Sequence, residues 1–352
     1  MMKQCFHCKK MTVLYRTYRP SKWSEVVGQE SIVNALTDAI SNKHISHAYL
    51  FSGSRGTGKT SVARILARAL DTKEEDVYEI DAASNRGIDD IRHLRDHVAV
   101  LPFNSPYKVY IIDEVHMLSK DAWNALLKTL EEPPQHVIFI LATTELDKVP
   151  ETIISRCQTF TFKRPSRDVI RIHVSAIAKK EGHTLDAGAA DLIALLGDGS
   201  FRDALGNLEK VLSSVKGKSA GIKRSEVEAI TGAPRSELIN DFITHVLAKD
   251  ADKSLTVISK AVESGLSMNI FLTLVLEKMR LILLIQNSPS SVAYVKARVS
   301  DDDMAFISTT AAKKLLTTHM LSSLLQAAIE TARASIESLP LEIAVVNIAA
   351  KV

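Results

Sequence analysis

One segment of the chain brings glycines, a lysine and a hydroxyl side chain to the spacing at which proteins hold nucleotide phosphates. It reads Gly53-Ser54-Arg55-Gly56-Thr57-Gly58-Lys59-Thr60 and matches the pattern G-x-x-x-x-G-K-[ST]. Because glycines have no Cβ, backbone N–H groups can turn toward phosphate oxygens there. We expect Lys59 on the β- and γ-phosphate oxygens and the Thr60 hydroxyl on Mg²⁺. The predicted ATP-binding residues of this segment are Gly53, Ser54, Gly56, Thr57, Gly58, Lys59, Thr60 and Ser61.

Two carboxylates directly follow an apolar run later in the chain. The run Val109-Tyr110-Ile111-Ile112 leads into Asp113 and Glu114. Acidic pairs after strands also occur as ordinary loop residues, but the phosphate-binding segment favours a catalytic interpretation. We expect Asp113 to hold Mg²⁺ and Glu114 to polarise a water for in-line attack on the γ-phosphate.

Three further side chains are candidates, each with an ordinary alternative. Thr144 ends a predicted strand and either approaches the γ-phosphate or caps the following short helix. Arg156, in Ser155-Arg156-Cys157, is either an arginine finger acting on a neighbouring subunit's nucleotide or a surface ion-pair residue. Arg202 falls in the first turn of a predicted helix, where the helix dipole disfavours a cation, so a phosphate-sensing role is mildly favoured.

Short apolar segments alternate with amphipathic helices from Tyr49 to about Phe162. Buried strands separated by helices form a parallel sheet covered on both faces. The phosphate-binding segment and the carboxylates should therefore meet at the carboxyl edge of an α/β sheet. The predicted strands are 48–52, 77–80, 108–112, 137–142 and 158–162, and the predicted helices between them are 60–70, 88–98 and 120–131.

Strand patterns end after Arg164-Pro165, and helical patterns continue almost to the C-terminus. A break near Gly232-Ala233-Pro234 separates a small helical region from a larger one. The predicted helices are 168–180, 187–196, 202–215, 224–230, 237–248, 252–264, 268–286, 301–308, 311–334 and 341–350.

Composition argues against a protein that binds nucleic acid by bulk charge, against a disulfide-stabilised protein and against a membrane protein. The 352 residues carry a formal net charge of only +3, so any nucleic-acid site must be a local patch. Three cysteines argue against a disulfide framework and fit a reducing cytosol. The N-terminus has no apolar signal segment, and the most apolar run, 268–285, carries Glu277, Lys278 and Arg280. We therefore expect a cytoplasmic protein that does not insert into a membrane.

The motifs taken together resemble one known family. They are His47-Ala48-Tyr49-Leu50-Phe51 before the P-loop, 79–87 (Glu-Ile-Asp-Ala-Ala-Ser-Asn-Arg-Gly), 113–118 (Asp-Glu-Val-His-Met-Leu), 126–134 (Leu-Leu-Lys-Thr-Leu-Glu-Glu-Pro-Pro) and Ser155-Arg156-Cys157. This set closely resembles the gamma/tau subunits of bacterial DNA polymerase III, the ATPases of the sliding-clamp loader. The likeness covers about Val13 to the C-terminus and is strongest from His47 to Arg164.

The resemblance implies an α/β fold of the AAA+ P-loop type with a helical lid, followed by an all-α oligomerisation collar. The expected divisions are a disordered extension over 1–10, an ATPase core over 11–165, a lid over 166–232 and a collar over 233–352. Arg156 is then expected to act in trans, Arg202 as the lid sensor and Thr144 as the first sensor. The adenine-side wall is expected at Tyr18, Pro20 and Val27, with core packing of the tyrosine side chain as the alternative. Arg86 and Lys120 are expected to contact DNA phosphates, or to be solvated surface bases.

Two departures from the family pattern affect these expectations. The family usually carries four cysteines between the P-loop helix and the Glu-Ile-Asp-Ala-Ala-Ser segment, whereas here only Asp71-Thr72-Lys73-Glu74-Glu75-Asp76 lies there. Cys5, His7 and Cys8 supply half a zinc site at most, so zinc binding is not expected. Cys157 is expected to be a small buried residue.

The second departure is at the C-terminus. The chain stops soon after Leu339-Pro340-Leu341, as in the short gamma form, so binding to the polymerase core and the helicase is not expected.

The expected function is that of a clamp-loader ATPase. ATP binding and hydrolysis at subunit interfaces would open the sliding clamp and load it onto primer–template DNA. The expected partners are other loader subunits, the clamp and this DNA, and no polymerase active site is expected in the chain. The alternative is an AAA+ DNA motor of the branch-migration or helicase type.

Overall fold

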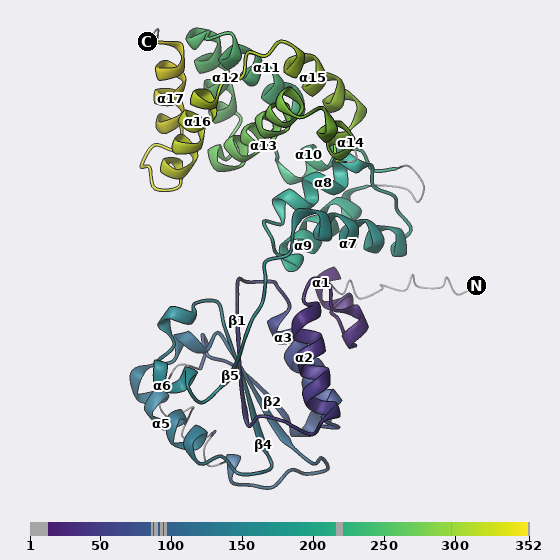
Figure 1. The fold of residues 1–352 in the computed structure, drawn as a ribbon, viewed down its shortest axis with the longest axis vertical. Helices are drawn as coiled ribbons and strands as arrows, with labels where there is room; N and C mark the ends of the chain where they lie inside the picture. Colours follow the sequence, from purple (N-terminus) through teal and green to yellow (C-terminus); the bar gives the residue numbers. More distant parts are fainter. Residues whose placement is uncertain are drawn as a thin grey trace, which may run out of the picture. The chain divides into compact units, whose positions relative to one another are not determined.

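The computed structural model describes residues 13–85, 87, 91, 94, 97–215, 221–296 and 298–350 (Figure 1). The chain divides into two compact units. The first runs to Ile170 and includes Gly197–Gly206, and the second consists of Arg171–Leu196 and the residues from Asn207 onward.

A five-stranded parallel sheet forms the centre of the first unit. Its strands are β1 (Ala48–Ser52), β2 (Val77–Asp81), β3 (Lys108–Asp113), β4 (Val137–Thr143) and β5 (Gln158–Thr161), in the order β2-β3-β4-β1-β5. Every residue of β1 and β4 is buried, whereas the edge strands β2 and β5 are partly exposed. This explains why the inner strands read as continuous apolar runs rather than as alternating patterns.

Helices cover both faces of this sheet. The helices of the first unit are α1 (Leu14–Thr17), α2 (Glu30–Ser41), α3 (Lys59–Ala69), α5 (Lys120–Glu131) and α6 (Glu151–Ile154), with 3₁₀ turns η1 (Trp23–Glu25), η2 (Glu74–Asp76), η3 (Val115–Met117) and η4 (Leu146–Lys148). On one face Leu126 of α5 packs with Leu50 and Ile112. On the other, Leu36 of α2 and Leu66 of α3 join a second apolar cluster.

The second unit is helical throughout its described residues, apart from one isolated bridge between Leu185 and Ile222. Its long helix α13 (Met268–Asn287) packs against α11, α15 and α16, and α16 packs against α17. The other helices are α8 (Ala187–Leu196), α10 (Arg224–Thr231), α11 (Ser236–Leu247), α12 (Ala251–Glu263), α14 (Val292–Lys296), α15 (Asp301–Ala312), α16 (Thr318–Thr331), α17 (Leu339–Ala349) and the 3₁₀ turn η5 (Pro289–Ser291). Helices α7 (Arg167–Lys180) and α9 (Phe201–Ser214) contribute residues to both units.

The predicted parallel α/β sheet followed by helices is confirmed, and all five predicted strands are present to within one residue at each end. The single helix predicted over 311–334 is wrong. The chain turns between α15 and α16, because Lys314 adopts a left-handed φ of 52° and the Thr317 side chain caps α16 by accepting from Met320 N. Helix α2 was not among the predicted helices, and most of the helix predicted over 88–98 lies outside the described residues. None of the described helices is long and apolar enough to cross a membrane.

Candidate active site

The phosphate-binding segment forms a loop between β1 and α3. Its three glycines have positive φ angles: 141° at Gly53, 75° at Gly56 and 102° at Gly58. Side chains with a Cβ rarely adopt such angles, so the sequence of glycines follows from the shape of the loop. Gly58 precedes α3 without a side-chain cap, which leaves the amides at the helix N-terminus free to bind an anion.

Ser200 and Phe201, at the start of α9, pack directly on this loop. Phe201 N donates to the Gly56 carbonyl oxygen at 3.1 Å. A Cβ added to Gly56 would lie 2.0 Å from Ser200 Oγ, which is too close for any side chain. Glycine is therefore favoured at position 56 for two reasons: its positive φ angle, and the lack of space for a Cβ next to Ser200.

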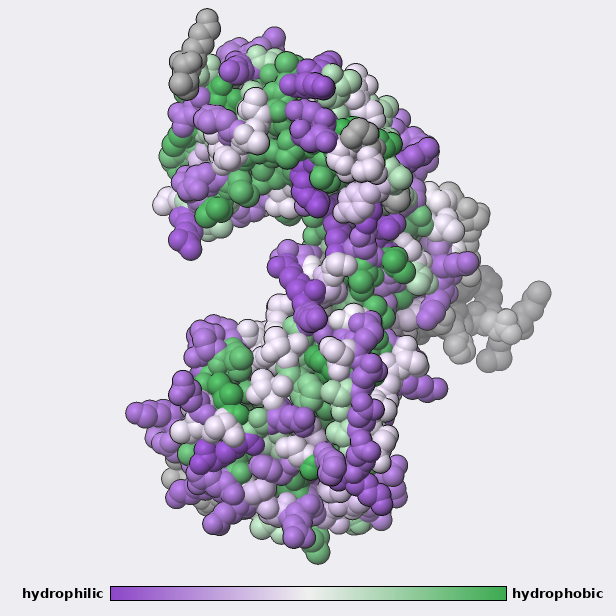
Figure 2. Space-filling model, in the orientation of Figure 1, coloured by the Kyte–Doolittle hydropathy of each residue, from purple (hydrophilic) through white to green (hydrophobic). Residues whose placement is uncertain are grey.

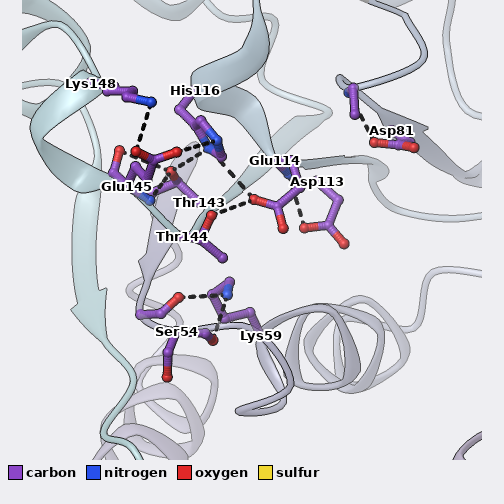
Figure 3. Close-up of polar contacts among 12 residues, drawn as sticks. Ser54, Lys59, Asp81, Asp113, Glu114, His116, Thr143, Thr144, Glu145 and Lys148 are labelled. Carbon is purple, nitrogen blue, oxygen red and sulfur yellow. Dashed lines mark hydrogen bonds and ion pairs between the residues drawn. The ribbon is translucent and has the colours of Figure 1, made fainter. Parts of the chain in front are cut away.

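Lys59 is buried at the start of α3, and its ammonium faces back into the loop. Nζ donates to the carbonyl oxygens of Gly53 at 2.7 Å and Ser54 at 3.0 Å (Figure 3). Burial lowers the pKa of Lys59, and the negative charges of Glu114 and Asp113 oppose part of this effect. Within the loop, Thr57 is also buried and its hydroxyl donates to Ser54 O at 2.9 Å, and Ser61 is buried in the first turn of α3.

Thr60 and Asp113 place two hard oxygen ligands side by side. Thr60 Oγ1 donates to Asp113 Oδ2 at 2.8 Å, and the other carboxylate oxygen accepts from Glu114 N at 3.0 Å. A hydroxyl and a carboxylate are ligands that Mg²⁺ accepts, with water and phosphate oxygens completing its octahedral shell. These residues therefore fit the metal expected from the sequence. Within the described residues, no group of three or more His, Cys, Asp and Glu side chains is placed to hold a metal.

Glu114 occupies a strained position at the carboxyl end of β3. Its φ is 49°, a left-handed angle that is uncommon for a residue with a side chain. Thr144, just beyond β4, donates from Oγ1 to Glu114 Oε2 at 2.9 Å. The structure thus brings the predicted base and the predicted first sensor into contact beside the phosphate-binding loop (Figure 3).

Both predicted phosphate-contacting arginines have partners within the chain. Arg156 donates to Glu131 Oε1 of α5 at 2.8 Å and to the Thr152 carbonyl oxygen at 2.7 Å. The Arg202 guanidinium lies over the Tyr15 ring, 4.9 Å from its centroid. Hydrogen bonds from Arg16 and Arg202 lower the pKa of the Tyr15 hydroxyl.

Comparison with known proteins places this site in a family. The family described as DNA polymerase III, delta subunit, matches residues 28–86 and 71–166, and the one described as DNA polymerase III subunits gamma and tau domain III matches 222–351. The chain is 44% identical over 273 residues to DNA polymerase III subunit tau of Bacillus subtilis, a match that covers 72% of this chain and 48% of that protein. It is 36% identical over 299 residues to DNA polymerase III subunit gamma of Buchnera aphidicola, a match that covers 79% of this chain and 80% of that subunit.

The chain belongs to the DNA polymerase III gamma/tau family. It spans about half the length of the tau relatives it matches, such as 48% of the B. subtilis protein. Among solved structures, the Thermotoga maritima RuvB Holliday junction branch migration motor matches with a TM-score of 0.52 at 20% identity, covering 65% of this chain and 79% of that one. At that identity the similarity supports the AAA+ fold and nothing further.

The remaining residues predicted from the gamma/tau resemblance differ in how exposed they are. Tyr18 caps the C-terminus of α1 and is half-buried, as is Pro20, whereas Val27 is exposed. Lys120 is exposed at the first position of α5, whose N-terminus is capped by Ser119. Arg86, Cys5, His7 and Cys8 lie outside the described residues. The roles of all these residues stay predictions.

Sequence reasoning missed three residues that contact the site in this gamma/tau chain. They are Tyr15 under Arg202, Glu131 paired with Arg156, and His116, whose imidazole lies beside Glu114. Two of these stand within quoted motifs, but no local pattern indicates the contacts that they make with residues distant in the chain, such as that of His116 with Glu145. Only the folded chain reveals the contacts.

Proposed function

We propose that this chain is the ATPase subunit of a bacterial DNA polymerase III clamp loader. ATP binding and hydrolysis at its subunit interfaces open the sliding clamp and load it onto primed DNA during replication, in the bacterial cytoplasm. The observation that carries this proposal is the convergence of Thr60, Asp113, Glu114 and Thr144 beside the P-loop, in a chain of the gamma/tau family.

Different residues of the chain have different roles in ATP binding and hydrolysis. The loop amides and Lys59 bind the phosphates, and the lysine exchanges its bonds to Gly53 and Ser54 for phosphate oxygens. Thr60 and Asp113 would hold Mg²⁺, and the ion would supply positive charge that neutralises the phosphates. Glu114 accepts a proton from the attacking water, and the Thr144 hydroxyl keeps the carboxylate in place beforehand.

Two arginines are proposed to contact nucleotide phosphates, one in a neighbouring subunit and one in its own subunit. Arg156 completes the site of a neighbouring subunit by leaving Glu131 for that subunit's γ-phosphate. Arg202, at the start of α9, leaves the Tyr15 ring to sense the phosphates of its own subunit. Tyr18, Pro20 and Val27 form the wall on the adenine side. Because each arginine has an alternative partner in the chain, nucleotide binding can shift the equilibrium between two arrangements.

The collar region offers a surface for assembly with other loader subunits. Leu325 and Ile329 on α16 and Leu339, Ile343 and Val346 on α17 are between 43% and 56% exposed and form the α16–α17 apolar stripe. Figure 2 shows hydrophobic surface over this end of the second unit. An exposed apolar patch on packed helices supports an oligomer interface.

A second apolar surface, on the first unit, supports binding of the sliding clamp. Leu101 and Phe103 are 72% and 81% exposed in the loop before β3. The buried Asp76 carboxylate accepts from Phe103 N at 2.7 Å, and the buried Lys108 ammonium donates to Val100 O at 3.3 Å. The loop is thus held in place while its apolar side chains face outward, as suits a contact to a partner protein.

DNA contact is proposed at Lys120 and Arg86, through phosphates rather than bases, because a loader must act on any sequence. Neutralising Lys120 should weaken binding of primed DNA and reduce its salt dependence. The rival function, a DNA motor, has the RuvB fold similarity in its favour, whereas the gamma/tau relatives at 36–44% identity support the loader. Polymerase chemistry, and binding to the polymerase core or the helicase, are not part of the proposal.

The decisive experiment measures ATP turnover of the complex reconstituted with its loader partners, with and without clamp and primed DNA. We expect joint stimulation by clamp and DNA, loss of nucleotide binding in Lys59→Ala, and retained binding without turnover in Glu114→Gln. Glu132→Gln, an exposed carboxylate just after α5, is the matched control and should hydrolyse normally. Stimulation by DNA alone, with no response to the clamp, would favour the motor instead.

A further inference from the structure

His116 is a buried imidazole beside the candidate active site that the hydrolytic mechanism does not use. It lies on η3, directly after the Asp113-Glu114 pair, and its side chain is 6% exposed. Figure 3 shows its ring between the side chains of Glu114 and Glu145. A buried ring nitrogen without a partner costs about 1–3 kcal/mol, so its contacts indicate what holds it there.

The imidazole joins two carboxylates from different elements. Nδ1 lies 3.0 Å from Thr143 Oγ1 and 3.5 Å from Glu114 Oε2, and Nε2 lies 3.2 Å from Glu145 Oε1. Glu145 is itself fixed by Lys148, whose Nζ is 2.7 Å from its other carboxylate oxygen. The ring is therefore held at both nitrogens, with Glu145 as its outer anchor and Glu114 on the side of the active site.

Glu114 is a residue whose orientation needs such support. Its left-handed backbone raises its conformational energy, and the Thr144 hydroxyl supplies one short hydrogen bond to Oε2. At 3.5 Å the contact of His116 with the same oxygen is long for a hydrogen bond. The imidazole therefore acts on this carboxylate through direct contact, and its own position is set by Thr143 and Glu145.

We propose that His116 is a positioning residue: anchored by Glu145, it sets the orientation in which the Glu114 carboxylate meets the attacking water. It does so without touching the nucleotide. This inference rests on the proposed ATPase function. It also extends the hydrolytic machinery to the loop after β4, because the outer half of the arrangement, Glu145 and Lys148, belongs to that loop and to η4.

Two isosteric substitutions separate positioning from simple space filling. The amide of Asn can replace Nδ1 of histidine, so His116→Asn keeps the side of the ring that faces Thr143 and Glu114. The longer Gln reaches the Nε2 position, so His116→Gln keeps only the bond to Glu145. His116→Ala removes both. His136 supplies the matched control, because it is a partly buried histidine of the same unit whose Nε2 lies 3.2 Å from the Val98 carbonyl oxygen.

The test uses the full chain reconstituted with its loader partners, clamp and primed DNA, and measures kcat and KM for ATP. We expect His116→Ala and His116→Gln to lower kcat about 10- to 100-fold, as for misplacement of a catalytic group, with KM changed less than about twofold. His116→Asn keeps the contacts toward Thr143 and Glu114 but loses the Glu145 anchor, so its kcat should lie between those of the wild type and His116→Gln. Affinity for a fluorescent ADP and the thermal unfolding midpoint should stay near wild type in all three, and His136→Asn should behave as wild type.

A nucleotide-free measurement tests the anchor separately. Deuterium exchange at the imidazole C2 of His116, followed by mass spectrometry, should be slow in the wild type and faster in Glu145→Gln. Unchanged exchange would remove Glu145 as the anchor. Normal kcat in His116→Ala, or equal losses in the Asn and Gln variants, would overturn the positioning role. A wild-type complex that fails to hydrolyse ATP would instead overturn the proposed function, so the two failures are distinguishable.

Discussion

Gly56 shows how one position can be fixed by two independent constraints. Its φ of 75° strains any residue with a Cβ, and such an atom would collide with Ser200 Oγ at 2.0 Å. We expect Gly56→Ala to push the segment before α9 away from the loop and to weaken ATP binding at least about tenfold, because the bond from Phe201 N to Gly56 O would be lost. Titration with a fluorescent ATP analogue measures this change.

Gly206 is the matched control for that substitution. It lies within α9 at an ordinary backbone angle, and an added Cβ would have nothing within 4 Å. Gly206→Ala should bind ATP normally and stabilise the chain by up to about 1 kcal/mol, because alanine favours helix. Equal losses of affinity in the two variants would contradict the steric argument.

Cys157 follows Arg156 directly, and it is partly buried rather than fully buried as expected from the sequence. Burial raises the pKa of the Cys157 thiol to about 12, so the thiolate is scarce at neutral pH. Alkylation at pH 8 should be roughly a thousandfold slower than for a free cysteine, whose pKa is about 8.5. Because the shift is upward, the rate should still rise about tenfold per pH unit between pH 9 and 11. Peptide mapping distinguishes alkylation of Cys157 from alkylation of Cys5 and Cys8. An alkylation rate of Cys157 that stops rising below pH 10 would contradict the prediction.

Four helices of the second unit meet at a buried charged cluster. The Lys278 ammonium of α13 lies 2.7 Å from Asp303 Oδ1 of α15, and Arg224 of α10 contacts both Asp303 and Glu228. Ser236, at the start of α11, donates to Asp303 Oδ1 at 2.6 Å. Although burial alone would raise the pKa of Asp303, the charges of Arg224 and Lys278 and these hydrogen bonds hold it below its ordinary value. The cluster thus joins α10 to three helices that follow it in the chain.

Removing the Asp303 carboxylate should therefore lower the stability of the helices that meet at this cluster. Asp303→Asn leaves two buried cations short of a counter-charge, and we expect a loss of about 3 kcal/mol in local stability. Amide hydrogen exchange in peptides of α10, α13 and α15 measures this, with an expected acceleration of about a hundredfold. Asp302→Asn, on the exposed side of the same turn, should change exchange little. Equal protection in the two variants would show that the cluster does not hold these helices together.

Local signals determined how well each helix and strand could be predicted. The predicted bounds of α5 agree with the structure because Ser119 caps one end and Pro133-Pro134 follows the other. The turn between α15 and α16 was missed because Lys314 takes the left-handed angle that usually marks a glycine. The P-loop and Asp113-Glu114 are contiguous motifs and were therefore accessible from sequence. The contacts of Tyr15 with Arg202 and of His116 with Glu145 join distant segments, and only tertiary packing brings them together.

For the assembled ATPase, the central question is whether Arg156 serves its own subunit or the next one. Its guanidinium is paired with Glu131 in the single chain, at a partly exposed site where such a pair contributes little stability. The arginine can therefore be released to a phosphate at small cost. We expect Arg156→Ala to fold normally and to bind ATP, and to lower hydrolysis only in complexes where the arginine faces a nucleotide.

Mixing two inactive variants distinguishes the two possibilities. Lys59→Ala removes the phosphate site but leaves the arginine, and Arg156→Ala does the reverse. If the arginine acts in trans, complexes reconstituted from both variants contain interfaces where the Arg156 of one copy meets the intact P-loop of another. Turnover per complex should then exceed the sum of the separate variants. If it acts in cis, each copy lacks an essential group and mixing restores nothing. Arg68→Ala, an exposed arginine at the end of α3, should leave turnover unchanged and controls for the loss of a surface charge.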